Sequence, residues 1–218
     1  MIGTDTAAPS RDTYRHGDLR RALLAAGIEL ARGGGPDAVV LREATRRAGV
    51  APNAAYRHFA DRRALLQAVC ATAQAALAVA MEDELASALA GLAAEGAPAD
   101  AARARLRGVG TGYLRFAQDE PGLFRTAFAV PDALGDTAFP PGTGGSGLTA
   151  FQLLTAALDA LVAAGVLPAE RRPGAEFLAW SAVHGLAMLA IDGPLRGLDR
   201  AQTRDIGQRL LDMVERGL

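Results

Sequence analysis

Apolar residues recur at helical spacing along nearly the whole chain, and this pattern limits the possible fold more than any other feature. Leu19, Leu23, Ala26 and Leu30, for example, follow one another at intervals of three or four residues and mark one face of a helix. Runs that alternate apolar and polar residues and are rich in Val, Ile and Thr, the usual pattern of strands, are absent. We therefore expect an all-α protein.

Helix-breaking residues divide this pattern into about nine helices. The first is expected to end at Gly33-Gly34-Gly35-Pro36, a strong stop signal. Asp61 is expected to cap the fourth, because its carboxylate can accept the free N–H groups of a first helical turn. The helices after the first are expected at residues 41–48, 52–59, 61–92, 101–118, from 121 onward, 148–164, 174–192 and 199–216.

The composition is that of a chain with a packed core. Half of the 218 residues are hydrophobic and 22% are charged, as in ordinary globular domains. The length fits one large domain, or a small domain followed by a larger one. The single cysteine, Cys70, excludes an intramolecular disulfide, and we expect it to be a small core side chain.

One stretch, Ala64–Met81, carries no charge and resembles a membrane span. It consists mainly of Ala, which contributes little to membrane insertion, and Gln67, Thr72 and Gln74 interrupt it. A buried helix of a soluble protein is therefore the better interpretation. Because the polar N-terminus also lacks the apolar core of a signal peptide, we expect a cytoplasmic protein with no membrane partner.

Basic residues are concentrated near the N-terminus. Residues 11–63 contain eleven Arg and six acidic residues, a net charge of +5, whereas residues 64–218 contain twelve Arg and seventeen acidic residues, a net charge of −5. This asymmetry favours contact between the front of the chain and a polyanion. An ordinary solvated surface is also compatible with it, so the charge alone leaves both interpretations open.

The segment Leu41–Phe59 has the pattern of a helix-turn-helix. Two short helical stretches flank Gly49, which tolerates the positive φ of a tight turn. Ala44 and Ala48 are small enough for the second stretch to cross closely. That second stretch begins with small residues that fit a major groove, where base edges are distinguishable. From spacing alone, an ordinary helix pair inside an α-bundle fits equally well.

Motifs in this region resemble those of the TetR family of bacterial regulators. They are Gly49-Val50, then Tyr56-Arg57-His58-Phe59 and Asp61-Arg62-Arg63-Ala64-Leu65-Leu66, preceded by Tyr14-Arg15-His16-Gly17-Asp18-Leu19-Arg20. The resemblance covers residues 14 to about 70. It implies a flexible N-terminal arm (residues 1–16), a helix-turn-helix DNA-binding domain (17–63) and a larger helical bundle for ligand binding and dimerisation (64–218).

The resemblance also implies which residues contact double-stranded DNA. They are Arg42, Pro52, Asn53, Ala54, Tyr56, Arg57, His58 and Arg62. Pro52, Asn53 and Ala54 match positions that approach bases. Arg42 matches a frequent contact position, and the others match positions near phosphate, with Arg57 suited to phosphate or base.

The chain departs from the family pattern at three places. Val40 and Leu41 stand where Ser or Thr usually caps the second helix, and Ala51 replaces the usual capping Ser of the recognition helix. Each missing cap is expected to cost about 1 kcal/mol of helix stability. Thr45 replaces a usual Ala.

A second resemblance lies in two C-terminal segments, Tyr113–Phe124 and Trp180–Leu186. They resemble the branch of the family with a Trp…His-Gly motif, and Trp180 and His184 share one helix face because they are four residues apart. The residues expected to line a small-molecule pocket are Tyr113, Phe116, Phe124, Phe128, Phe151, Trp180, His184 and Met188.

These side chains predict a mostly apolar site with few polar groups, suited to a neutral or weakly charged hydrophobic effector. The Pro131–Gly147 segment holds three Pro and five Gly and is a candidate gate. The alternative is that the aromatic residues fill a solid core, with Trp180 and His184 as ordinary core residues.

The last two long helices are expected to form a homodimer interface, because they carry more apolar surface than one side of a core needs. Their apolar rows are Leu178, Ala182, Gly185 and Leu189, and Ile206, Leu210 and Met213. A two-fold dimer predicts a palindromic operator. Repression with release by the effector is expected, with activation as the alternative.

No motif of an enzyme is found. The sequence has no His/Asp/Glu cluster with metal spacing and no nucleotide-binding or hydrolase motif, so no catalytic residue, metal or cofactor is predicted. The Gly142-Thr-Gly-Gly145 segment lacks the preceding strand of a phosphate-binding loop. A helical interaction module or a helical enzyme with an incidental helix-turn-helix remains the alternative.

Overall fold

The computed structural model of the chain describes residues 16–92, 97–130 and 142–218, with side chains from residue 19 onward except that of Pro52. The predicted N-terminal arm and residues 131–141 of the candidate gate lie outside the described residues, apart from His16. Within the described ranges the chain is all-α, without a strand, which confirms the predicted fold class.

Nine α-helices and two short 3-10 helices make up the described part of the chain. The α-helices are α1 (His16–Gly34), α2 (Leu41–Ala48), α3 (Pro52–Ala55), α4 (Arg62–Ala90), α5 (Pro98–Asp119), α6 (Pro121–Ala127), α7 (Ala150–Ala163), α8 (Ala175–Ile191) and α9 (Arg200–Gly217). The 3-10 helices are η1 (Pro36–Ala38) and η2 (Ala169–Arg171).

Local capping residues determine where several helices begin. The Asp61 carboxylate accepts a hydrogen bond of 2.8 Å from the Ala64 N–H, as predicted for the cap of α4. Thr149 and Asp199 each form a capping box with the glutamine three residues later, and these boxes start α7 and α9. α7 therefore begins two residues after the predicted position.

The third helix is shorter than predicted. The pattern predicts that it continues to His58 and Phe59, whereas α3 ends at Ala55. The backbone N–H groups of His58 and Phe59 both donate to the Ala55 carbonyl over 2.9 Å, so the chain turns tightly there. This turn carries the Phe59 ring, which is 2% exposed, into the core beside α1 and α4. The helix thus ends in a turn that places Phe59 in the core.

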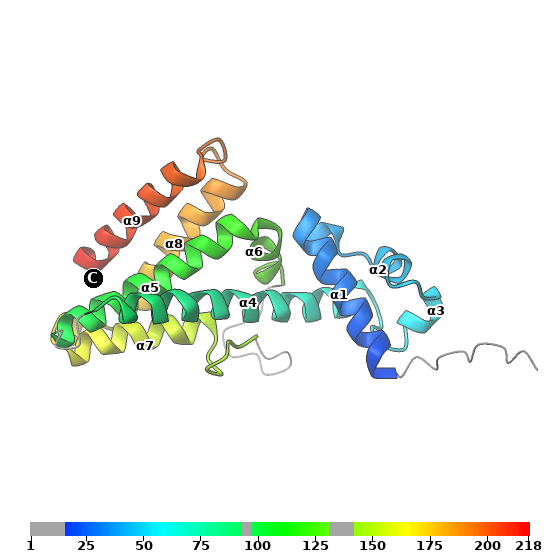
Figure 1. Cartoon of the computed structure of the whole chain (residues 1–218), viewed down its shortest axis with the longest axis horizontal. Helices are drawn as coiled ribbons and strands as arrows, with labels where there is room; N and C mark the ends of the chain where they lie inside the picture. Colours follow the sequence, from blue (N-terminus) through cyan, green and yellow to red (C-terminus); the bar gives the residue numbers. More distant parts are fainter. Residues whose placement is uncertain (1–15, 93–96, 131–141) are drawn as a thin grey trace, which may run out of the picture.

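The helices form two connected bodies (Figure 1). α1, α2 and α3 lie together at one end, and α4 runs from them along the length of the molecule, with α5 and α7 beside it. α8 and α9 pack on α5, and α6 lies between α5 and α1. Close contact of α4 and α5 depends on Gly112, where a Cβ atom would lie 2.5 Å from the Met81 Cα atom.

α4 is the central helix of the core. By length and composition it is the one helix in the described ranges that could cross a membrane. However, 44% of its most apolar 18-residue stretch is buried inside the fold. Leu65, Val69 and Leu77 on this helix are fully or almost fully enclosed. Cys70 is also buried, and its thiol donates to the Ala127 carbonyl over 3.2 Å, as expected for a core side chain.

Candidate functional site

α2 and α3 form the predicted helix-turn-helix. Gly49 ends α2 in the left-handed conformation, with φ of 67°, and its N–H donates to the Arg46 carbonyl. Neither Val40 nor Ala51 provides a side-chain cap, as their sequence predicts. Thr45 is buried and its hydroxyl donates to the Arg42 carbonyl over 2.7 Å, so the helix itself satisfies this polar group.

Most of the residues predicted to contact DNA are solvent-accessible. Pro52 lies in the first turn of α3, and its side chain is outside the described atoms. Tyr56 is 57% exposed although it is aromatic, which is unusual for a residue with only a structural role. Exposed side chains are those of Arg42, Asn53, Tyr56, Arg57 and Arg62, and half-buried ones are those of Ala54 and His58.

Some arginines of the helix-turn-helix pair with a carboxylate and others do not. Arg46 and Arg47 both pair with Glu43, at 2.5 and 3.3 Å. Hydrogen bonds from Arg46 above all lower the pKa of Glu43 to about 2, so this carboxylate stays ionised and compensates its neighbours. In the described part of the chain, no carboxylate pairs with Arg42 or Arg57. Their charges are therefore free to meet phosphate.

Arg62 has contacts that the sequence does not reveal. Its Nε and one terminal nitrogen each donate over 2.8 Å, to the backbone carbonyls of Val39 and Pro36. Its guanidinium also lies 3.9 Å from the Asp37 carboxylate. The side chain thus ties the start of α4 to the segment that leads into α2. Its predicted phosphate contact stays a prediction, and any such contact shares the guanidinium with these carbonyls.

Six of the eight predicted pocket residues form one cluster of rings in the larger body. Phe128 is at its centre, with ring centroids 4.9 Å from His184, 5.3 Å from Phe124 and 6.2 Å from Trp180. The other two members are Tyr113 and Phe151. The rings come from α5, the end of α6, α7 and α8, so the fold brings together residues that are distant in sequence.

The remaining two predicted residues are placed differently. Phe116 is buried in the core, and Met188 is half-buried against it. Phe177 was missed, although its ring centroid lies 5.9 Å from that of Phe151. The spacing of three residues between Phe177 and Trp180 is the sequence signal that identifies it, because such residues share a helix face.

The polar groups of this aromatic cluster form hydrogen bonds with one another. Trp180 Nε1–H donates to the Tyr113 hydroxyl over 3.1 Å, and that hydroxyl lies 2.8 Å from His184 Nδ1. The hydroxyl donates its proton to Nδ1 when the neutral imidazole has its proton on Nε2, and accepts from Nδ1–H in the other tautomer, so either neutral form of His184 satisfies this bond. Burial lowers the pKa of His184 and raises that of Tyr113, so both groups stay neutral near pH 7.

The segment that follows residue 141 is held on α4. Glu82 accepts hydrogen bonds from the backbone N–H groups of Gly145 and Ser146, at 2.8 and 3.0 Å. Gln74 accepts one from the Gly142 N–H and donates another to the Ala127 carbonyl at the end of α6. Residues 142–147 of the predicted gate are thus attached to α4, and its other residues lie outside the described ranges.

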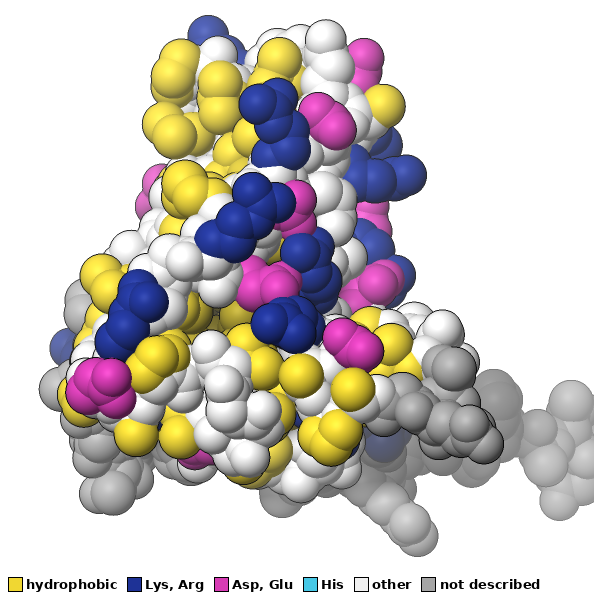
Figure 2. Space-filling model, turned by 90° about the vertical axis from the view of Figure 1, so that its left-hand side faces the viewer, with side chains coloured by type: hydrophobic (Ala, Val, Ile, Leu, Met, Phe, Trp, Pro, Cys, Tyr) yellow, Lys and Arg dark blue, Asp and Glu magenta, His cyan; other side chains and the backbone are white. Residues whose placement is uncertain are grey.

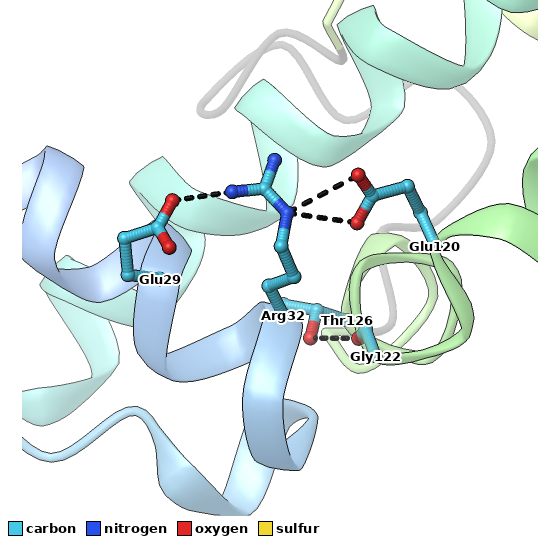
Figure 3. Close-up of polar contacts among 5 residues, drawn as sticks. All are labelled: Glu29, Arg32, Glu120, Gly122 and Thr126. Carbon is cyan, nitrogen blue, oxygen red and sulfur yellow. Dashed lines mark hydrogen bonds and ion pairs between the residues drawn. The ribbon is translucent and has the colours of Figure 1, made fainter.

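The end of α1 touches the beginning of α6 (Figure 3). Arg32 Nε donates to the Glu120 carboxylate over 2.8 Å, and a second nitrogen of its guanidinium contacts Glu29. Gly122 lies so close to α1 that a Cβ atom there would be 2.3 Å from the Ala31 carbonyl oxygen. We call this contact the α1–α6 joint. It connects the helix-turn-helix body with the larger body.

α6 also reaches the aromatic cluster and α8. Phe124 and Phe128, at its middle and its end, belong to the cluster. Thr126 is fully buried and its hydroxyl donates to the Gly122 carbonyl over 2.7 Å. Arg125 extends to Asp192 at the end of α8, 3.4 Å away, and packs against Gly35. One short helix therefore contacts α1, the aromatic cluster and the end of α8.

The outer faces of α8 and α9 expose apolar side chains. Leu178 is 68% exposed and Met213 60%, and Gly185 has open space beside it. Figure 2 shows hydrophobic side chains beside rows of arginine and acidic side chains at the end of the molecule where α9 finishes. Arg107 fixes α9 to α5 through Asp212 at 2.6 Å and Glu215 at 2.8 Å.

Comparison with known proteins identifies both bodies. Residues 23–69 match the family profile described as bacterial regulatory proteins, tetR family. Residues 106–214, half of the chain, match the profile described as tetracyclin repressor-like, C-terminal domain. No curated protein matches the chain significantly.

Solved structures share the fold over almost the whole chain. A protein of unknown function from Rhodococcus sp. RHA1 is 27% identical, covers 95% of this chain and 99% of its own, and gives a TM-score of 0.71. TetR from Acinetobacter baumannii AYE is 19% identical with a TM-score of 0.54, covering 95% and 96%. A tetR-family regulatory protein from Rhodococcus RHA1 is 18% identical with a TM-score of 0.53, covering 91% and 95%. The last two similarities concern the fold alone.

Proposed function

Because the chain belongs to the TetR family of bacterial regulatory proteins and is a DNA-binding transcriptional regulator, we propose that it is a ligand-responsive repressor. In this proposal residues 17–63 bind a palindromic operator, and residues 64–218 form the homodimer and bind a small hydrophobic effector. It acts by binding and not by catalysis, in the cytoplasm, where its DNA is.

One observation carries the DNA-binding proposal. α2, α3 and the turn after α3 expose Arg42, Asn53, Tyr56 and Arg57, and no carboxylate in the described ranges neutralises the two guanidinium groups. Unpaired guanidinium groups suit phosphate, while an exposed amide on a recognition helix suits a base edge, adenine above all. In a dimer the two recognition helices would enter successive major grooves, with half-sites about 34–36 Å apart or somewhat more.

Selection of bound fragments from genomic or random duplex DNA tests this proposal. A shared palindrome is expected among the bound fragments. Arg57→Ala should weaken binding and lower the salt slope by about one, as expected for a lost phosphate contact, whereas Asn53→Ala should change the preferred sequence. Arg105→Ala on α5, also exposed, is the matched control. Equal binding of all duplexes, or no effect of Arg57→Ala, would contradict the proposal.

The aromatic cluster supports the effector proposal. Its rings are in contact and its hydroxyl, indole and imidazole groups bond one another. A hydrophobic ligand that enters the cluster has to separate these rings, and Phe124 and Phe128 belong to α6. A shift of α6 acts directly on the α1–α6 joint. The ligand can change DNA affinity only by as much as its own affinity differs between the two arrangements.

Operator binding in the presence of hydrophobic compounds tests the regulatory mode. Release of DNA by a compound that also changes Trp180 fluorescence is the result expected of a repressor. Tighter binding would instead identify an activator or a corepressed regulator. Phe128→Ala is expected to abolish the response while operator affinity without ligand is kept, because the ring belongs to the aromatic cluster of the larger body and not to α2 or α3.

A further inference from the structure

A cavity lies apart from the aromatic cluster. It has a volume of about 230 Å³, is partly open to solvent, and lies between the last turns of α5 and α8, the first residue of α6, the connection from α8 to α9 and the first turn of α9. Its apolar wall includes the buried residues Leu114, Ala117, Leu186 and Ala187. None of the rings of the aromatic cluster lines it, so the two sites use different faces of α5 and α8.

Polar groups line this cavity at specific places. Arg196 and Arg200, both exposed, contribute two guanidinium groups. Arg200 pairs with Asp119 over 2.7 Å, whereas no carboxylate within the described residues pairs with Arg196. The half-buried Gln118 also contributes an amide that has no hydrogen bond to any described residue.

The acidic groups nearby are already engaged. The Asp199 carboxylate caps α9 by accepting the Gln202 N–H over 2.8 Å, and Asp192 lies beside Arg125. The Thr203 hydroxyl donates to the Asp199 carbonyl over 2.9 Å. The positive charge of Arg196, at the edge of this mostly apolar cavity, therefore has no carboxylate partner in the described residues.

We propose that this cavity binds a small amphipathic carboxylate, with its apolar body between α5 and α8 and its carboxylate on Arg196 and the Gln118 amide. A guanidinium is the usual partner of a carboxylate because two parallel hydrogen bonds form. The volume is below the range of pockets for drug-sized ligands, so a ligand of about ten non-hydrogen atoms is expected.

The position of the cavity gives such a ligand a regulatory role. Pro121, which begins α6, lines it, and the next residue, Gly122, contacts the end of α1. Asp119, the partner of Arg200, precedes Glu120, which pairs with Arg32. A bound carboxylate thus lies beside the α1–α6 joint. This regulatory part rests on the proposed DNA-binding function, whereas carboxylate binding itself does not.

Calorimetric titration of the full-length protein with octanoate tests the site, with 1-octanol as the uncharged analogue. Octanoate is expected to bind with a Kd of about 0.1–1 mM, as suits about ten non-hydrogen atoms. Arg196→Gln should weaken octanoate at least about tenfold, the effect of a lost charged hydrogen bond, and leave 1-octanol unchanged. Ala190→Phe, from the cavity wall, should abolish binding of both.

Two variants make the outcome unambiguous. Arg204→Gln removes an exposed charge near the start of α9 from a residue that does not line the cavity. This variant should bind octanoate as the wild type does. Phe151→Leu alters only the aromatic cluster. No binding by the wild type, or octanoate binding that survives Arg196→Gln and Ala190→Phe but is lost in Phe151→Leu, would overturn the proposal. Should Ala190→Phe fail to fold, Ala190→Leu replaces it.

Operator binding separates the two proposals. Arg196→Gln lies outside the helix-turn-helix and should bind the operator as the wild type does in the absence of octanoate. Failure of the carboxylate site leaves operator binding intact, whereas failure of the DNA-binding proposal leaves the calorimetric result intact. If octanoate binds at this cavity but does not alter operator affinity, the regulatory role is wrong and the binding site stands.

Discussion

At the scale of single residues, Tyr113 joins the polar groups of the larger body. It is 4% exposed, accepts the indole N–H of Trp180 and shares a hydrogen bond with His184 Nδ1. A buried group of this kind contributes mainly by preventing unsatisfied partners, whose cost exceeds the net gain of a hydrogen bond. Tyr113 thereby holds α5 against α8 in one arrangement.

Tyr113→Phe is expected to lower the free energy of unfolding by about 1–3 kcal/mol, because both partners lose their bond. Trp180 fluorescence should also change, since its N–H loses its acceptor. Urea unfolding monitored by fluorescence and circular dichroism measures both effects. Tyr56→Phe, which removes the hydroxyl of a residue 57% exposed, is the control and should leave stability unchanged. Equal stabilities of the two variants would contradict this role.

His184 makes the stability of the protein dependent on pH. Burial lowers its pKa in the folded state, whereas the unfolded chain has the ordinary value of about 6.5. Below that value the unfolded chain binds more protons than the folded one, so the free energy of unfolding is highest above pH 6.5 and decreases as the pH falls. Urea unfolding at pH 7.5 and 5.5 should show this loss, and His184→Gln should show a smaller one. An equal loss in both proteins would exclude His184 as the cause.

Arg57 and Arg62 are both exposed arginines of the DNA-binding region, but their neighbours differ. Arg62 bonds the carbonyls of Val39 and Pro36, so Arg62→Ala should lower both stability, by about 1 kcal/mol, and operator affinity. Arg57→Ala should lower operator affinity and the salt slope without a change in stability. Chemical unfolding combined with binding at several salt concentrations distinguishes the two. If Arg62→Ala and the wild type unfold at the same midpoint urea concentration, the contacts of Arg62 with the two carbonyls do not stabilise the fold.

At the scale of secondary structure, α6 is the short helix that connects the helix-turn-helix body with the larger body. Seven residues, Pro121–Ala127, contact α1, α4 and α5, and the helix carries Phe124 of the aromatic cluster. The Arg32–Glu120 pair at its start is partly exposed and contributes little to stability. Close contact at Gly122 is therefore the stronger determinant of how α6 sits on α1.

Gly122→Ala is expected to force α6 away from α1, because the new Cβ atom would lie 2.3 Å from a backbone oxygen that cannot rotate away. Overpacking of this kind costs about 1–3 kcal/mol. Thermal unfolding measures the loss, and operator binding should weaken as the helix-turn-helix body shifts. Gly33→Ala in α1 has open space around it and should be neutral or slightly stabilising. The same result for both variants would show that the joint is not tightly packed.

At the scale of the whole molecule, the outer faces of α8 and α9 expose apolar side chains. Leu178, Leu189 and Met213 are exposed and lie on the two helices that carry the predicted apolar rows. Two copies related by a two-fold axis would bury these rows against each other in a four-helix bundle. The dimer remains a proposal for this chain, supported by that exposed surface.

Gly185→Arg is expected to produce monomers, because it puts a charge at the middle of the α8 face while open space beside the glycine allows the fold to form. Sedimentation equilibrium measures the mass, and operator affinity should fall strongly because a monomer contacts only one half-site. Gly197→Arg, also in open space but in the connection after α8, should stay dimeric. A wild-type protein that sediments as a monomer at micromolar concentration would contradict the proposal.

Sequence reasoning succeeds here where neighbours along the chain determine the structure. Helical spacing, the cap at Asp61 and the turn at Gly49 act within a few residues, so the all-α class and the helix-turn-helix can be predicted directly. The helix-turn-helix resemblance is confirmed by the family comparison. The predicted end of α3 was wrong, because the chain turns after Ala55 and places Phe59 in the core, a tertiary contact that helical spacing does not reveal.

Only the tertiary structure determines which distant residues meet. Arg62 bonds carbonyls 23 and 26 positions before it, and Arg32 pairs with Glu120 across 88 positions. The cavity beside Arg196 likewise exists only where α5, α6, α8 and α9 converge. Helical periodicity tells which face of each helix is apolar, but it holds no information on which faces pack together. Close packing of side chains across the helices makes that choice, and with it the contacts that connect the two bodies.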